Sequence, residues 1–398
     1  MQDLEWTVFD RGEVAINHLK EQIGRFERQK QIRAQLNVQP WGGGWARMLS
    51  VALYHSGPDL AEIGSTWVGD FVRMDALTSF TPQEVFRLGG KDRFLPACWA
   101  SGITPAGPDT LEVCWAIPWT ADVRAIFYWK DMLQLAGIDE NLAFQDALAF
   151  DNTLKRLSEH GFNIPLAIPT VRSRLTIHYL ASWMWAAGGD FVRPSFREVG
   201  FNSTESLRGL KQYFQLGRYL PKQEKILDEG RAFDLFYTRQ AAVTMGGYWI
   251  LMSTSIPPEM KANLGVAMVP GAPFVGGSHL VVFKHSNRKN PALQVIDFLT
   301  REPELLQFIL AFGLPAWLDG LEKPPFSTDP KLKALSDMVR KGRSFSSGQL
   351  WGLVETRLVD TFPLIWKDVV KGKDPDIDAI LHSHLDSLAE RLNITIHG

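Results

Sequence analysis

Residues 114–131, CWAIPWTADVRAIFYWKD, decide how the sheet of this chain is organised. Pro118 has no backbone N–H to donate to a sheet ladder, and it biases Ile117 toward an extended conformation. Beyond the proline, residues 123–128 are rich in β-formers and alternate in character, which favours a second strand. The stretch is therefore predicted to form strand, break, strand, with the break at Pro118.

Three unlike side chains stand between the two predicted strands. Trp119 offers a flat apolar face, Asp122 an acceptor, and Arg124 a fork of donors. One interpretation is an edge-strand proline with a core tryptophan and a surface ion pair. The other is a chain crossing between two domains, which would carry all three side chains into the crevice between them. These residues alone leave both interpretations open.

Length and composition narrow the class of protein. At 398 residues the chain is long for one core, so we expect two domains. Its 45% hydrophobic and 22% charged residues are typical of a soluble globular protein, and a formal charge of -2 argues against a nucleic-acid surface. No apolar run approaches the roughly 20 residues of a membrane helix. No signal peptide is visible, so we expect either a cytoplasmic protein or the mature form of an exported one.

Cys98 and Cys114 are the only cysteines, too few for a zinc cage or a disulfide scaffold. They are expected either to pair with each other or to remain small buried thiols. We expect no metal and no cofactor. The run Gly42-Gly43-Gly44 lacks the residues of a P-loop or a dinucleotide site and is interpreted as a flexible turn that displays two indoles, Trp41 and Trp45.

The first 67 residues alternate between strand and helix patterns. Strands are predicted at 4–9, 32–38 and 60–63, with a helix between the first two. Polar or aromatic residues follow each strand. In open α/β sheets, ligands gather outside the carboxyl ends of the strands, so these residues are expected to lie near one another. They are Asp10 and Arg11, then Trp41, then Ser65, Thr66 and Trp67.

Short motifs in a consistent order extend this pattern along nearly the whole chain. They are Ser56-Gly57-Pro58-Asp59, Ile117-Pro118 followed at four residues by Asp122, Tyr128-Trp129-Lys130-Asp131, Ala187-Gly188-Gly189-Asp190, Ala242-Val243-Thr244-Met245 with Gly246 and Trp249, and Val269-Pro270 followed by Gly276-Gly277-Ser278. In these motifs the chain resembles the extracellular solute-binding proteins of ABC importers, in particular the carbohydrate-binding group typified by maltose-binding protein.

The resemblance implies an α/β, two-lobed periplasmic-binding-protein fold of type II with the ligand cleft between the lobes. It places the N-terminal lobe at residues 1–117 plus 273–314 and the C-terminal lobe at 118–272 plus 315–398. Three interdomain crossings are then expected, near Pro118, Pro270 and Leu314.

The resemblance also implies ligand contacts from both lobes. The positions that match are Asp10, Arg11, Ser65, Thr66, Trp67, Asp122, Trp249 and Trp351, while Gly277 and Ser278 belong to a matching motif. Asp190 and Arg124 are added as an acceptor and a donor for sugar hydroxyls. Trp41 and Trp119 are additions of this sequence. Thr66 and Trp67 stand where maltose-binding protein has an acidic and a basic residue, so maltodextrin specificity does not follow.

The implied function is the binding of a sugar, a di- or oligosaccharide, by hinge closure, and its delivery to the membrane permease of an ABC transporter. The protein is expected to be an extracytoplasmic monomer without enzymatic activity or nucleic-acid partner. A competing interpretation is a two-lobed binder of a polyamine, a phosphorylated polyol or a peptide; of these, a cationic ligand is the strongest competitor, because indole faces and carboxylates also suit a cation. A sensor-coupled sugar binder and a glycoside hydrolase also stay open, although the two flanking carboxyl groups that the hydrolase needs are not identifiable.

Overall fold

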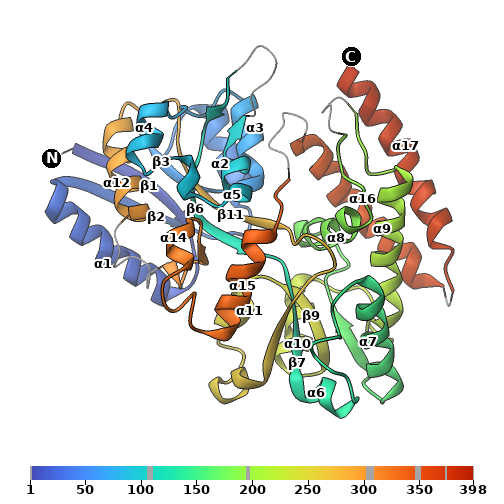
Figure 1. Cartoon of the computed structure of the whole chain (residues 1–398). Coiled ribbons are helices and arrows are strands. Elements are labelled where there is room, and N and C mark those ends of the chain that lie inside the picture. The colour runs from blue at the N-terminus through green and yellow to red at the C-terminus, as the bar shows by residue number, and fades with distance from the viewer. Residues whose placement is uncertain are drawn as a thin grey trace. The chain divides into compact units, whose positions relative to one another are not determined.

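A computed structural model of the chain describes residues 2–104, 111–193, 198–301, 309–345, 351–372 and 374–397 (Figure 1). It forms two compact units. The first contains Met1–Asp122, Val275–Arg340 and Ser344–Gly352, and the second contains Val123–Phe274, Lys341–Arg343 and Leu353–Gly398. The division differs from the expected lobes chiefly over residues 315–340 and 344–352, which belong to the first unit, so the chain first leaves this unit after Arg340 and leaves it finally after Gly352, not near Leu314.

The first unit is built on a six-stranded mixed sheet of order β12-β6-β11-β3-β1-β2. Its strands are β1 (Gln2–Phe9), β2 (Ile32–Gln39), β3 (Leu60–Gly64), β6 (Ile117–Val123), β11 (Val275–Val282) and β12 (Leu314–Pro315). Strand β1 runs parallel to β2 and β3, whereas β11 is antiparallel to β3 and β12 to β6. Strands β4 (Ile103–Thr104) and β5 (Val113–Cys114) form a separate pair.

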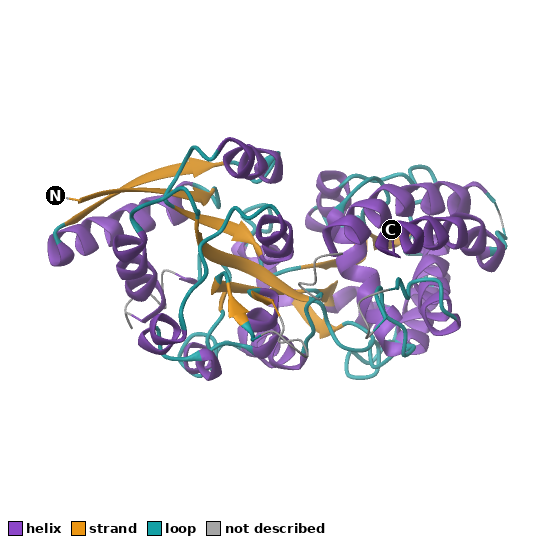
Figure 2. Ribbon diagram, turned by 90° about the horizontal axis from the view of Figure 1, so that it is seen from above, coloured by secondary structure: helices purple, strands orange, loops and turns teal. Residues whose placement is uncertain are grey.

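Helices cover both faces of this sheet (Figure 2). They are α1 (Glu13–Lys30), α2 (Gly44–Tyr54), α3 (Val68–Arg73), α4 (Pro82–Arg87), α5 (Pro96–Ser101), α12 (Lys289–Arg301), α14 (Leu318–Leu321) and α15 (Pro330–Lys341), with single turns η1 (Ser65–Trp67) and η2 (Lys91–Arg93). On one face, Phe26 of α1 meets Phe298 of α12 edge-on at 5.3 Å. On the other, Met48 of α2 and Phe71 of α3 pack with Phe9 of β1.

The second unit has a four-stranded sheet of order β10-β7-β9-β8. Its strands are β7 (Ala125–Trp129), β8 (Ile164–Ala167), β9 (Ala241–Gly246) and β10 (Leu264–Met268). Strand β7 is antiparallel to β9 and β10, and β8 is parallel to β9.

The second unit also contains α6 (Lys130–Leu135), α7 (Ala147–Glu159), α8 (Arg174–Ala186), α9 (Thr204–Phe214), α10 (Glu229–Tyr237), α11 (Trp249–Met252), most of α16 (Trp351–Lys371), α17 (Ile377–His397), η3 (Gln215–Tyr219) and η4 (Pro258–Asn263). Trp183 of α8 lies 5.4 Å from Tyr213 of α9, whose ring lies 5.6 Å from Trp366 of α16. These fully buried rings join three helices.

The expected strand, break, strand pattern is present, but the break at Pro118 was wrong. Strand β6 runs unbroken from Ile117 to Val123, and the interruption falls at Arg124, just before β7. Pro118 is tolerated because it is the second residue of the strand, and the pairing of β6 with β12 begins at Thr120. At the break, the Arg124 N–H donates to the Phe274 carbonyl at 3.0 Å, which keeps that donor satisfied.

Cys98 and Cys114 are both buried and free, so they do not form the disulfide that the sequence left open. Among the residues that the structure describes, no helix combines the length and the apolar composition needed to cross a membrane.

Candidate functional site

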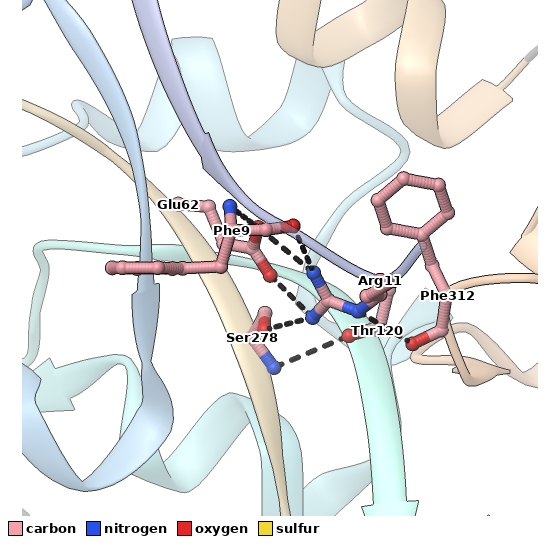
Figure 3. A network of polar contacts seen from close by, with 6 residues as sticks. All are labelled: Phe9, Arg11, Glu62, Thr120, Ser278 and Phe312. Carbon is pink, nitrogen blue, oxygen red and sulfur yellow. Dashed lines mark hydrogen bonds and ion pairs between the residues drawn. The ribbon is translucent and has the colours of Figure 1, made fainter. Parts of the chain in front are cut away.

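Arg11, directly after β1, forms the centre of a polar network in the first unit (Figure 3). Its Nη2 donates to Glu62 Oε1 at 2.5 Å and to Ser278 Oγ at 3.0 Å. Its Nη1 donates to Glu62 Oε2 and to the Phe9 carbonyl, both at 3.1 Å, and its Nε donates to the Phe312 carbonyl at 3.1 Å. A guanidinium has five N–H donors, and all five have acceptors within the protein.

Glu62, the partner of Arg11, is a site residue that the sequence analysis missed. It lies in the middle of β3 and is fully buried, and its Oε2 also accepts the Phe9 N–H at 2.8 Å. A carboxylate at the centre of the apolar strand Leu60–Gly64 is the signal that would have found it, because a buried charge requires a partner. Glu62 and Arg11 together join the end of β1 to the middle of β3 and to Ser278 within β11.

Trp41 lies beside this network. Of the tryptophans that the structure describes, it alone exposes more than a third of its surface, 39%. Its indole stacks on Phe9 with 4.3 Å between ring centroids and 24° between planes. The Arg11 guanidinium carbon lies 5.1 Å from the indole centroid, within cation–π range. The Trp41 indole is thus partly exposed to solvent and is held in place by Phe9 and Arg11.

The loop that carries Trp41 is held by its own backbone and by Arg47. Gly43 adopts the left-handed conformation at φ 72°, and Gly44 packs so closely on Phe9 that a Cβ there would lie 2.5 Å from the Phe9 ring. The Gly44 N–H donates to the Trp41 carbonyl at 2.9 Å, and Arg47 donates to the Gly42 carbonyl at 2.7 Å. The structure therefore confirms a turn that displays Trp41, but not the second indole, because Trp45 is half-buried against Trp67 and Phe71.

The turn after β3 supplies the second aromatic of this group. Trp67 is 8% exposed and meets the rings of Phe9 and Trp41 edge-on at 5.8 and 6.0 Å. Ser65 is buried and Thr66 is half-buried in the same turn. Arg11, Trp41 and Trp67, which follow three predicted strands, thus meet through direct contacts or through Phe9, and Ser278 joins them through Arg11.

Other predicted residues of the first unit lie elsewhere. Asp10 is exposed, and its Oδ1 accepts the Gly12 N–H at 2.8 Å. Trp119 is fully buried, edge-on to Trp6 at 6.0 Å and 5.2 Å from Phe312, so it is a core residue. A Cβ on Gly277 would lie 2.0 Å from the Thr120 carbonyl oxygen, so this glycine serves strand packing.

Two further predicted site residues lie in the first unit. Asp122 is half-buried near the end of β6. Trp351 is 4% exposed and stacks on Phe345 at 4.1 Å. Both residues belong to the first unit, so Trp351 is not the aromatic of the second lobe that the resemblance implied.

In the second unit, Arg124 and Trp249 come together. Trp249 is half-buried at the start of α11, and the Arg124 guanidinium carbon lies 4.8 Å from its ring centroid. Arg124 is itself buried, and its Nη2 lies 3.1 Å from Nδ1 of His178. The imidazole of His178 stacks on Phe274 at 4.2 Å.

The protonation state of His178 follows from its surroundings. Burial first, and then the charges of Arg124 and Arg174, hold the pKa of His178 well below its usual value, so the ring is neutral at pH 7. Its Nδ1 then accepts from Arg124, and the Nε2–H lies 4.0 Å from Oε1 of the buried Glu355. Arg174 forms an ion pair with the other carboxylate oxygen of Glu355. The sequence analysis missed His178, Arg174 and Glu355.

Asp190 stands apart from this group. Its Oδ1 accepts from Trp185 Nε1 at 3.1 Å and from the Phe191 N–H at 2.8 Å, and its Oδ2 pairs with Arg343 at 2.8 Å. The Arg343 guanidinium carbon also lies 4.6 Å from the Trp185 ring centroid. Both carboxylate oxygens of Asp190 therefore already have protein donors.

The chain belongs to the bacterial extracellular solute-binding protein family, whose sequence profile matches residues 15–304. Its fold is that of the periplasmic binding proteins. The sugar-binding protein MalE of Xanthomonas citri aligns with a TM-score of 0.82 at 20% identity, covering 99% of this chain and 98% of that one. A solute-binding protein of Thermotoga lettingae, solved with α-D-tagatose, aligns with a TM-score of 0.80 at 19% identity and covers both chains completely.

The chain is also similar to curated relatives. Binding proteins of Brucella abortus and Brucella suis are 24% identical over 280 residues, a match that covers 67% of this chain and 64% of theirs. The alignment thus spans less than two thirds of the length of these relatives.

Proposed function

We propose that this chain is the solute-binding component of an ABC importer and that its ligand is a di- or oligosaccharide. The protein acts outside the cytoplasm and delivers this sugar to the membrane permease of the importer. Family membership supports the binding role. Solved proteins of the same fold contain maltose or laminaribiose, which supports a sugar as ligand. The same proposal holds that the protein binds the sugar without converting it chemically and that it closes on the bound ligand.

The observation that carries the proposal is the exposed indole of Trp41. One side of a pyranose ring is rich in C–H groups and lies well on an aromatic face, while its hydroxyls require fixed polar partners. Trp41 offers such a face with 39% of its surface exposed, and Phe9 holds the ring from within the unit. Trp249 is the corresponding candidate in the second unit.

The charges around these indoles favour a sugar over a polyamine. A cation would gain most from an electron-rich face beside unengaged carboxylates. Instead, Trp41 adjoins the Arg11 guanidinium at 5.1 Å and Trp249 adjoins that of Arg124 at 4.8 Å. The carboxylates of Glu62 and Asp190 are engaged by arginines of the chain itself. An uncharged ligand is not repelled by these guanidinium groups.

Calorimetric titration with maltose, laminaribiose, tagatose, spermidine and glycerol phosphate tests the proposal. We expect at least one sugar to bind and spermidine not to bind. Trp41→Ala should weaken sugar binding about tenfold, because stacking contributes about 1 kcal/mol or more. Tyr54→Ala removes another exposed aromatic of the same unit and should leave the affinity unchanged. Binding of spermidine alone would refute the proposal.

A further inference from the structure

Arg11 contacts Trp41, the candidate residue for stacking on the sugar, but it has no N–H left for a ligand. Its five donors are used by Phe9, Glu62, Ser278 and Phe312, and its side chain is 14% exposed. The acceptors belong to the end of β1, the middle of β3, the middle of β11 and the segment before β12 (Figure 3). Five bonds in a planar fork fix both the position and the tilt of the guanidinium.

The fixed guanidinium lies between two aromatic rings. Its central carbon is 5.1 Å from the Trp41 centroid and 4.9 Å from the Phe312 centroid. Phe9 stacks on the same indole at 4.3 Å, and its own N–H and C=O bind Glu62 and Arg11. Of the groups that contact the Trp41 indole, the Phe9 ring and the Arg11 guanidinium are thus both held by the Arg11–Glu62 pair.

We infer that the Arg11–Glu62 pair is the positioning element of the sugar site: it acts through Trp41, which it holds in the orientation for stacking, rather than by touching the ligand. This inference rests on the proposed function and replaces the ligand contact that the resemblance implied for Arg11. A side chain that is exposed yet immobile loses little conformational entropy when a ligand stacks on it.

The first test needs no ligand. The double variant Arg11→Met/Glu62→Gln removes both charges at once, so that no buried charge is left unpaired. Acrylamide quenching of Trp41 is obtained as the difference between each protein and its Trp41→Phe counterpart. Because the residue is 39% exposed when held, full release of its side chain should raise the quenching constant up to about 2.5-fold. An unchanged constant in a folded double variant would overturn the inference.

The matched control is a second arginine pair of the same unit. Arg93 binds Asp319 at 3.3 Å and lies 5.6 Å from the ring centroid of Trp317, which is 2% exposed. Arg93→Met/Asp319→Asn should leave the quenching of Trp41 unchanged. An equal rise in this control would show a general loosening of the unit and would overturn the inference.

The second test is a thermodynamic cycle with whichever of maltose and laminaribiose binds the wild-type protein. We expect the double variant and Trp41→Ala each to weaken binding about tenfold, and the triple variant to be no weaker than Trp41→Ala. An additive loss of about a hundredfold would show that the pair acts independently of Trp41 and would overturn the inference. If neither sugar binds, the proposed function fails, whereas the quenching experiment still decides the role of the pair.

Discussion

Glu62→Gln should destabilise the first unit strongly although it changes a single oxygen to an NH₂ group. Glu62 is fully buried, and its carboxylate receives two N–H groups of Arg11 and the N–H of Phe9. Glutamine keeps one acceptor oxygen but loses the charge. The substitution therefore leaves the Arg11 guanidinium buried without its anion.

The size of the effect follows from the burial of both partners. Removing one partner of a buried ion pair costs about 3–5 kcal/mol. Arg11 is 14% exposed, so water screens the remaining charge only slightly, and the retained acceptor recovers part of one hydrogen bond. We expect a loss of about 3 kcal/mol in the free energy of unfolding, and a recovery to within about 1 kcal/mol of wild type in Arg11→Met/Glu62→Gln.

Urea unfolding followed by circular dichroism measures the loss. At ordinary denaturant slopes, about 3 kcal/mol moves the midpoint of the first unit by about 1 M or more. Asp297→Asn is the matched control, because it breaks an exposed pair with Arg301, where both side chains are about half exposed, and should cost under about 0.5 kcal/mol. If Glu62→Gln cost under about 1 kcal/mol, or if the double variant were no more stable than the single one, the reasoning would be refuted.

Three further predictions concern the same unit. Gly44→Ala should lower the free energy of unfolding by about 1–3 kcal/mol, because its Cβ would lie 2.5 Å from an aromatic carbon. A Cβ at Gly42 has nothing within 4 Å, so Gly42→Ala should cost under about 0.5 kcal/mol. Equal losses of stability in thermal unfolding would contradict this packing. Burial lowers the pKa of His279 to about 4, below its value in the unfolded chain. The contribution of the neutral His279 ring to the free energy of unfolding is therefore complete above about pH 6.5 and has fallen by about 2 kcal/mol at pH 5. His279→Gln should therefore lose less stability than wild type between pH 7.5 and pH 5, and parallel losses would argue against this assignment. Burial also raises the pKa of the Cys98 and Cys114 thiols to about 12, so a thiol reagent at pH 8 should react with both only after unfolding; fast labelling of the native protein would contradict their burial.

Much of the local structure could be predicted from the sequence. The strands expected at 4–9, 32–38 and 60–63 are β1, β2 and β3, with bounds that differ by at most two residues. Apolar residues at helical spacing gave α1, and the glycine run gave the turn that displays Trp41. These features depend on neighbours along the chain, whose spacing is visible without coordinates.

The partners of charged groups could not be predicted in this way. Arg11 was expected to donate to a ligand because it matches a contact position of the resembling family, and Asp190 to accept from one because sugar hydroxyls require fixed acceptors. The structure gives all the donors of Arg11 and both oxygens of Asp190 to protein groups, among them Ser278 and Arg343, which are distant in sequence. Local sequence patterns do not predict these pairings, because the partners come from distant segments of the chain.

The sequence by itself therefore determined the elements, their order and the family, because periodicity, turn residues and motif spacing are local properties of the chain. Only the tertiary structure decided which aromatic and charged residues serve the core and which face outward. Trp119 and Trp41 are both tryptophans next to a proline, yet one is fully buried between Trp6 and Phe312 and the other is 39% exposed on Phe9. Burial is the sum of contacts from segments far apart in the chain, so it appears only when the sheet has brought them together.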